Sequence, residues 1–153
     1  MALTKTDTIK AAMVAGAPAT MDFRSDAARR TELGLPAHDL EDFCLRQLLP
    51  DYDQNRQKII DARSPIKWPE KLNKKTPILM MHGTSDFSVL PQDSLEMAAA
   101  LLKLRHPFRL LMLEGGKHAL VNYDAEVNRA LKEWLDHYVR DRKTWPPLEP
   151  DRK

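Results

Sequence analysis

The most constraining feature of the sequence is a continuous apolar run over residues 77–82, which ends at Gly83. A strand with one face in water alternates apolar and polar residues, whereas this run does not alternate. Uninterrupted runs of this length are typical of strands that are covered on both faces, as in a parallel sheet. Parallel strands need crossover connections, so the rest of the chain is expected to supply helices between its strands.

Other segments fit this scheme. Residues 108–113 form a second continuous run closed by two glycines, and the short run from Ile9 to Ala15 is stopped by a glycine and a proline. Residues 91–105 and 122–140 repeat apolar side chains at helical spacing. The alternation of strands and helices predicts the α/β class, with about three parallel strands, flanking helices and right-handed crossovers.

Each of these two helices is expected to bury one face. The apolar face of the first comprises Leu95, Ala98, Ala99, Leu101 and Leu102. The apolar face of the second comprises Val127, Leu131, Trp134, Leu135 and Tyr138. A more polar helical region is predicted within residues 25–62. We expect residues 1–143 to form one folded unit and residues 144–153 to form a flexible tail.

Composition excludes several classes of protein. With 153 residues, 42% of them hydrophobic and 30% charged, the chain has the balance of one ordinary globular domain. The net charge of +2 is spread among interspersed acidic and basic residues, which argues against nucleic acid as a partner. The single cysteine, Cys44, cannot form an internal disulfide, and no spacing of Cys and His residues indicates zinc. No cofactor or metal is implied.

Membrane and secretory signals are also lacking in the sequence. No apolar run reaches the roughly 20 residues that a membrane-spanning helix needs. The first residues do not have the basic and then apolar layout of a signal peptide. Together with the single cysteine, these features favour the cytoplasm and no membrane contact.

Two polar side chains stand where the predicted strands end. Asp86 lies in the loop after the first run, and His118 lies in the loop after the second. Active sites in parallel sheets gather at the carboxyl ends of the strands. A carboxylate that accepts a hydrogen bond from one imidazole nitrogen leaves the other nitrogen free to take a proton from a nucleophile. Alone, Asp86 is also typical of a turn and His118 of a surface loop.

The sequence around these residues contains two distinctive motifs. Residues 81–89 read Met-His-Gly-Thr-Ser-Asp-Phe-Ser-Val, and residues 115–119 read Gly-Gly-Lys-His-Ala. These motifs resemble the prolyl oligopeptidase family of serine peptidases, which have the α/β-hydrolase fold. Weaker similarity extends upstream to residues 6–18 and 63–66. The resemblance implies that Asp86 is the acid and His118 the base of a catalytic triad. It also places Val89 near the substrate pocket, and Gln92 and Ser94 at the start of the next helix.

The sequence departs from this family at the nucleophile. None of its five glycines is positioned to form the Gly-x-Ser-x-Gly elbow around a serine. The serines are Ser25, Ser64, Ser85, Ser88 and Ser94. We therefore expect a C-terminal portion of a catalytic domain that begins within the helix after the elbow and is inactive or nearly so alone. The parent activity would be hydrolysis of a peptide or ester bond through an acyl-enzyme.

Two other functions fit the sequence. One is a non-catalytic interaction module with a binding surface on residues 39–61, and the other is a fragment of a small-ester α/β-hydrolase. For the partial catalytic domain, the strand order of the family it resembles implies that the strand from Ile9 to Ala15 lacks a neighbour and forms an open apolar edge. Such an edge favours self-association or pairing with a polypeptide that carries the missing half.

The remaining histidines and Cys44 are interpreted as structural. His82 ends a buried strand and is expected to bond to the backbone. His38, His106 and His137 are predicted at helix ends or on a polar face. Cys44 is predicted to be a buried packing residue rather than a reactive thiol.

Overall fold

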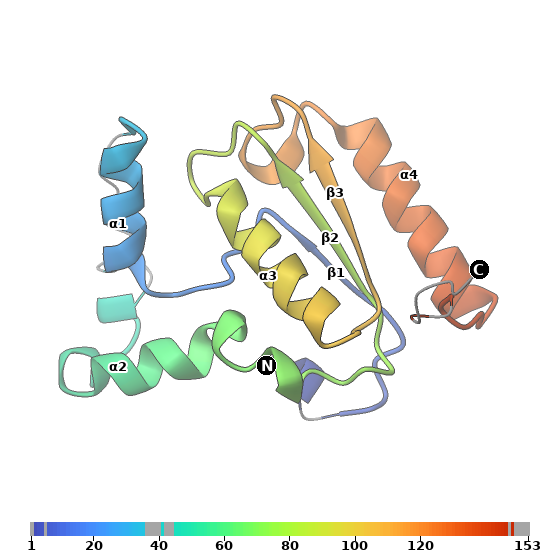
Figure 1. Cartoon of the computed structure of the whole chain (residues 1–153), viewed down its shortest axis with the longest axis horizontal. Helices are drawn as coiled ribbons and strands as arrows, with labels where there is room; N and C mark the ends of the chain where they lie inside the picture. The colour runs from blue at the N-terminus through green and yellow to red at the C-terminus, as the bar shows by residue number, and fades with distance from the viewer. Residues whose placement is uncertain (1, 5, 36–40, 42–44, 147, 149–153) are drawn as a thin grey trace.

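Three parallel strands form the centre of the molecule. The computed structural model describes residues 2–4, 6–35, 41, 45–146 and 148. Its sheet has the order β1 (Ala12–Ala15), β2 (Ile78–Gly83) and β3 (Phe108–Leu113), with β2 paired to both neighbours in parallel. Figure 1 shows the three strands side by side between helices. The predicted α/β class and parallel sheet are confirmed.

The central strand is buried along its whole length, as its uninterrupted apolar sequence predicts. Its alternate side chains serve two separate cores. Ile78 and Met80 pack on one face against helix α3 (Pro91–Lys103), while Leu79 and Met81 pack on the other face against helix α4 (Asp124–Leu135). Each helix therefore covers one face of the sheet, with α3 and α4 on opposite sides (Figure 1).

The apolar face of α3 is narrower than the sequence pattern suggests. Met97, Ala98 and Leu101 are buried against the sheet, but Leu95 and Leu102 are exposed. An α-helix turns by about 100° per residue, so Leu95 and Leu102 point more than a quarter turn away from Leu101. Their assignment to the buried face was therefore wrong.

Helix α4 is also shorter than predicted, because its last turn changes geometry. The α-helix ends at Leu135, and Asp136–Arg140 continue as a π-helical turn. Trp134 is buried and donates a hydrogen bond from its ring nitrogen to the Ala12 carbonyl in β1, 3.1 Å away. Leu135 is exposed, contrary to the predicted apolar face.

The polar region between β1 and β2 forms a lobe of its own. Helices α1 (Phe23–Glu32) and α2 (Tyr52–Arg63) share a small core of Phe23, Leu45, Tyr52 and Ile60. Hydrogen bonds from Arg56 to Glu41 raise the pKa of the guanidinium above its usual value and tie the lobe together. Helices were thus correctly expected here, although part of the predicted helix near residues 40–49, with His38 and Cys44, lies outside the described residues.

Short helical turns complete the architecture. They are η1 (Ala2–Thr4), η3 (Pro65–Lys67), η4 (Pro69–Lys71), η5 (His118–Leu120) and the π turn η6 (Asp136–Arg140). The proline-rich stretch after α2 forms η3 and η4. No helix in the described part of the chain combines the length and the apolar character needed to cross a bilayer.

Strand β1 lies at one edge of the sheet and is shorter than predicted. It begins at Ala12 rather than Ile9, because Ala12 is the first residue opposite β2, in register with Ile78. Val14 is 37% exposed and Ala15 is also exposed, whereas the aligned β2 residues are buried. Within the described residues no further strand pairs with the outer side of β1.

Candidate active site

The loops after β2 and β3 are held together by direct contact between two glycines. A Cβ atom on Gly83 would lie only 2.1 Å from the carbonyl oxygen of Gly116, so no larger residue fits there. Backbone hydrogen bonds from Thr84 to Leu113 and from Ser85 to Gly116, both 2.9 Å, join the same loops. The glycines therefore fix how closely the two loops, and the side chains that they carry, approach each other.

Asp86 lies in the loop after β2 and is only 3% exposed. Its Oδ1 accepts hydrogen bonds from the backbone N–H groups of Ser88 (2.9 Å) and Val89 (3.0 Å). Its Oδ2 lies 2.9 Å from Nδ1 of His118. The buried carboxylate thus has several donors, which is what an ionised group away from water requires.

His118 lies at the end of the loop after β3, with its side chain 46% exposed. Because the Asp86 carboxylate accepts at Nδ1, the proton of the neutral ring is on Nδ1 and Nε2 carries a lone pair. No residue in the described part of the chain hydrogen-bonds Nε2. The ring is therefore oriented by the acid and presents a free basic nitrogen at the surface.

The backbone directly after His118 is held in an uncommon conformation. Ala119 and Leu120 have φ angles of 62° and 57°, in the left-handed region that non-glycine residues rarely adopt. Leu120 is nevertheless buried against the core of α4. The buried Leu120 side chain anchors this turn, and the turn sets the position of His118.

Sequence analysis missed one residue that adjoins this pair. Gly16 follows β1 with a φ of 53°, and a Cβ on it would lie 3.1 Å from Oδ2 of Asp86 and 3.6 Å from Nδ1 of His118. The signal was available, because a glycine at the carboxyl end of a parallel strand marks the same edge as the two predicted loops. All three strand ends therefore meet at the Asp86–His118 pair.

Arg30 is the second residue that sequence analysis missed. It is buried in α1 and donates a 2.7 Å hydrogen bond from Nη2 to the carbonyl of Ser88. This contact connects the α1 lobe to the loop that carries Asp86. Nothing in the local sequence around Arg30 distinguishes it from the neighbouring Arg29, which is less buried.

The other predicted residues occupy different positions around the pair. Val89 is half-buried and borders a small hollow together with Pro18 and Phe23, and its role in substrate binding stays a prediction. His82 bonds to the backbone carbonyl of Val89, as predicted. His106 follows the end of α3, in line with the prediction of a helix end, but it is buried, and its Nδ1 lies 3.1 Å from the carbonyl oxygen of Pro107.

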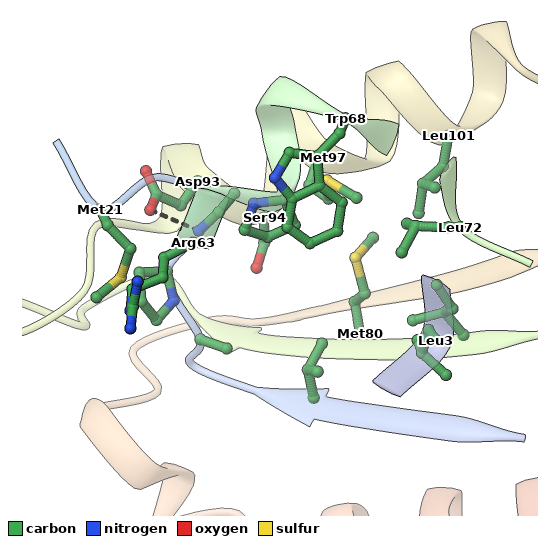
Figure 2. Close-up of a pocket in the computed structure, with 16 residues that line it drawn as sticks. Leu3, Met21, Arg63, Trp68, Leu72, Met80, Asp93, Ser94, Met97 and Leu101 are labelled. Atoms are coloured by element: carbon green, nitrogen blue, oxygen red, sulfur yellow. Dashed lines mark hydrogen bonds between the residues drawn. The ribbon is translucent and has the colours of Figure 1, made fainter. Parts of the chain in front are cut away.

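A pocket of about 460 Å³ lies beside β1, on the face of the sheet that α3 covers. Figure 2 shows its walls, with Trp68, Met80, Met97 and Leu101 around the interior and Asp93 at one end. Asp93 accepts backbone hydrogen bonds from Ala19 (2.9 Å) and Thr20 (3.4 Å). Burial raises the pKa of the Asp93 carboxyl group, while these two N–H groups act in the opposite direction.

Comparison with solved structures identifies the same architecture in larger proteins. The chain is 26% identical to a puromycin-hydrolyzing peptidase of Mycobacterium tuberculosis, with a TM-score of 0.65 over 91% of this chain and 19% of that one. It is 22% identical to a puromycin hydrolase (TM-score 0.67, 96% of this chain and 21% of that one). It is 15% identical to a Pyrococcus horikoshii acylaminoacyl peptidase (TM-score 0.68, 97% and 23%).

These similarities establish a fold and a family. The chain spans about a fifth of the length of the first of these structures, and the two less similar ones support the fold alone. No match was found among curated proteins. Residues 3–142 match the prolyl oligopeptidase family, peptidase family S9. With three parallel strands and flanking helices of the α/β-hydrolase fold, the chain is a serine peptidase-like domain that belongs to the prolyl oligopeptidase family.

Proposed function

We propose that this chain supplies the acid and the base of a serine peptidase whose nucleophile comes from a polypeptide segment outside these 153 residues. The observation that carries the proposal is the contact of 2.9 Å between Oδ2 of Asp86 and Nδ1 of His118, which leaves Nε2 of His118 without a partner among the described residues. A free, oriented Nε2 is the feature that a general base needs.

In this proposal His118 moves a proton twice. Nε2 takes the proton of a serine hydroxyl as the serine oxygen attacks the substrate carbonyl, and then gives that proton to the leaving amine as the acyl-enzyme forms. In the second half-reaction, Nε2 takes a proton from water as the water oxygen attacks the acyl carbonyl. It then gives this proton to the serine oxygen as the acid product leaves. Asp86 holds the ring and stabilises its charged form without taking the proton. Without the serine, the pair has no nucleophile to activate, so the chain alone is expected to be inactive.

The open side of β1 is the proposed binding place for the missing segment. The connections from β1 to β2 and from β2 to β3 both pack on the face of Met80, because Trp68, Leu72 and α3 share one core there. Right-handed crossovers that progress in one direction stay on one face of a sheet. A strand added in parallel outside β1 would therefore carry its following helix on this face, over the apolar pocket (Figure 2).

The peptide substrate and the compartment belong to the same proposal. Val89 would border the substrate, because it lies in the acid loop and its backbone N–H is hydrogen-bonded to Asp86.

The cytoplasm is supported by the single cysteine, since reducing compartments make no use of disulfides.

The first test is covalent labelling with a fluorophosphonate, followed by intact mass. The purified chain is expected to remain unlabelled. After addition of the preceding catalytic-domain segment of a matched peptidase, the added serine should become labelled with the native chain and not with a His118→Ala variant. Labelling of the isolated chain that disappears in His118→Ala would contradict the proposal, because it would reveal a nucleophile within these residues.

The second test addresses the occupant of the β1 edge. A Val14→Lys variant places a charge on this edge and should weaken binding of the added segment, measured by gel filtration. A matched Leu102→Lys variant changes an exposed leucine on α3 and should bind normally. If the chain instead forms a concentration-dependent dimer that Val14→Lys disrupts, the occupant is a second copy, and complementation by a nucleophile segment is disproved for the isolated chain.

A further inference from the structure

A second histidine stands behind the acid. His82 is fully buried at the end of β2, and its Nε2 lies 3.0 Å from the carbonyl oxygen of Val89 and 3.3 Å from Oδ2 of Asp86. Its Nδ1 lies 2.6 Å from the hydroxyl of Ser94 in the first turn of α3. Both ring nitrogens of a buried imidazole are therefore engaged, one by the acid loop and one by the helix that follows this loop.

These contacts fix the tautomer of the neutral ring. A carbonyl and a carboxylate can only accept, so Nε2 must carry a hydrogen. In the neutral ring, Nδ1 then accepts a hydrogen bond from the Ser94 hydroxyl. His82 and His118 thus hold opposite tautomers on the two sides of one carboxylate.

We propose that His82 is a positioning residue for the triad acid. Its Nε2–H donates a hydrogen bond to the carbonyl of Val89. The backbone N–H of Val89 donates to Oδ1 of Asp86, so the His82 ring and the Asp86 carboxylate stabilise the same turn. The Nε2–H of His82 also lies beside Oδ2, the carboxylate oxygen nearer to Nδ1 of His118 (2.9 Å, compared with 3.1 Å for Oδ1). His82 therefore sets where the carboxylate points and, through it, which tautomer His118 adopts.

Other groups around this turn do not replace the contribution of His82. Arg30 reaches the loop from α1 but binds the carbonyl of Ser88, whereas His82 binds the carbonyl of Val89. Asp93 is engaged by the backbone of Ala19 and Thr20 and by Arg29. Among the described residues of α3, the Ser94 hydroxyl is the group that hydrogen-bonds the ring.

The test measures tautomers by nitrogen-15 NMR of the histidine rings in the isolated chain, so it needs neither a serine nor turnover. This inference rests on the proposed roles of Asp86 and His118, but its outcome is independent of whether complementation succeeds. In the native chain, Nε2 of His82 should show a protonated signal and Nδ1 an unprotonated one. The reverse assignment would overturn the proposal, since His82 could then donate to neither Val89 nor Asp86.

Two variants separate positioning from mere packing. His82→Met fills the site but removes the donor, and the ratio of the Nδ1–H to the Nε2–H form of neutral His118 should fall by up to about tenfold, because the turn that directs the Asp86 carboxylate toward His118 loses a hydrogen bond. His82→Gln keeps a donor near the position of Nε2 and should preserve the native ratio. An unchanged ratio in His82→Met, or an equal fall in both variants, would refute the role of the donor.

A less disruptive substitution tests the same role if His82→Met does not fold. Ser94→Ala removes only the hydroxyl that holds Nδ1, and it should lower the same His118 ratio by a smaller factor, about two to three, because the ring can then rotate away from Val89. An unchanged ratio in folded Ser94→Ala, with Nδ1 of His82 unaffected, would count against the proposed chain of contacts.

Discussion

β1 and β2 are neighbours in one parallel sheet, but the described residues bury β2 more fully than β1. β2 is buried on both faces, and it leads into a loop whose carboxylate has backbone and imidazole donors. β1 leaves Val14 37% exposed beside an apolar pocket and pairs only with β2 among the described residues. Yet Gly16, at the end of β1, lies against the Asp86–His118 pair.

This difference indicates which part of the chemistry the chain organises by itself. The relation between acid and base depends on contacts within the described part of this chain, most of them among residues 82–120, with Arg30 bound to the same loop. The side on which a nucleophile would stand is the side that remains open. Substitutions on both strands and their loops test this difference. The largest effect is expected in the loops that carry the pair.

The strongest prediction is that Gly83→Ala destabilises the fold by at least about 3 kcal/mol, because its Cβ would overlap the backbone of Gly116 and neither loop can retreat from its hydrogen bonds. The free energy of unfolding in urea measures this. Gly115→Ala is the matched control in the same loop, since its Cβ would meet open space. That variant should cost only about 1 kcal/mol for its φ of 64°. Equal losses would show that crowding at Gly83 is not decisive.

The next prediction compares the two strands directly. Leu79→Ala removes a fully buried side chain of β2 and should lower the free energy of unfolding by about 3 kcal/mol. Val14→Ala removes a partly exposed side chain of β1 and should cost less than about 1 kcal/mol. A large loss in Val14→Ala, measured in the same urea series, would mean that the β1 edge is already covered in solution.

Most of the fold could be predicted from sequence because burial on two faces leaves a continuous apolar pattern. Residues 108–113 were predicted with their observed bounds, since the run is closed by glycines that end the strand. The exposure of Leu95 and Leu102 could not be predicted, because a helix rich in leucine and alanine does not reveal which side meets the sheet.

The site was predictable in part for a related reason. Asp86 and His118 follow strands, and strand ends converge, so their encounter follows from topology. Gly16 could have been placed at the same edge, because it follows a strand, whereas the contact of Arg30 depends on how distant segments meet in space, and no local pattern marks it. The inward placement of His106 depends in the same way on the loop that precedes β3.

A third prediction uses His106, at the opposite end of the sheet from the candidate site. Burial lowers the pKa of this imidazole below its ordinary value of 6.5. Below about pH 6.5, His106 is protonated more readily in the unfolded chain than in the folded chain. The free energy of unfolding should therefore fall as the pH decreases through this range. The slope should approach about 1.4 kcal/mol per pH unit, the value for one proton.

The measurement for this prediction is urea unfolding between about pH 7 and 5. A His106→Gln variant should show a flatter profile than the native chain, whatever its absolute stability. The comparison between the two proteins cancels other titrating groups, among them Asp93, whose raised pKa acts in the opposite direction at lower pH. Parallel profiles would show that His106 is not a source of the pH dependence.

The smallest expected effect concerns the turn that holds His118. Ala119 has a φ of 62°, so Ala119→Gly relieves strain of about 1 kcal/mol but adds unfolded-state entropy of similar size. The free energy of unfolding should therefore change by less than about 0.5 kcal/mol. Ala99→Gly, at an exposed position inside α3, has no strain to relieve and should lose about 1 kcal/mol. If the two variants lose the same amount, the turn is unstrained, and His118 owes its position to Asp86 and the glycine contact rather than to the backbone that follows it.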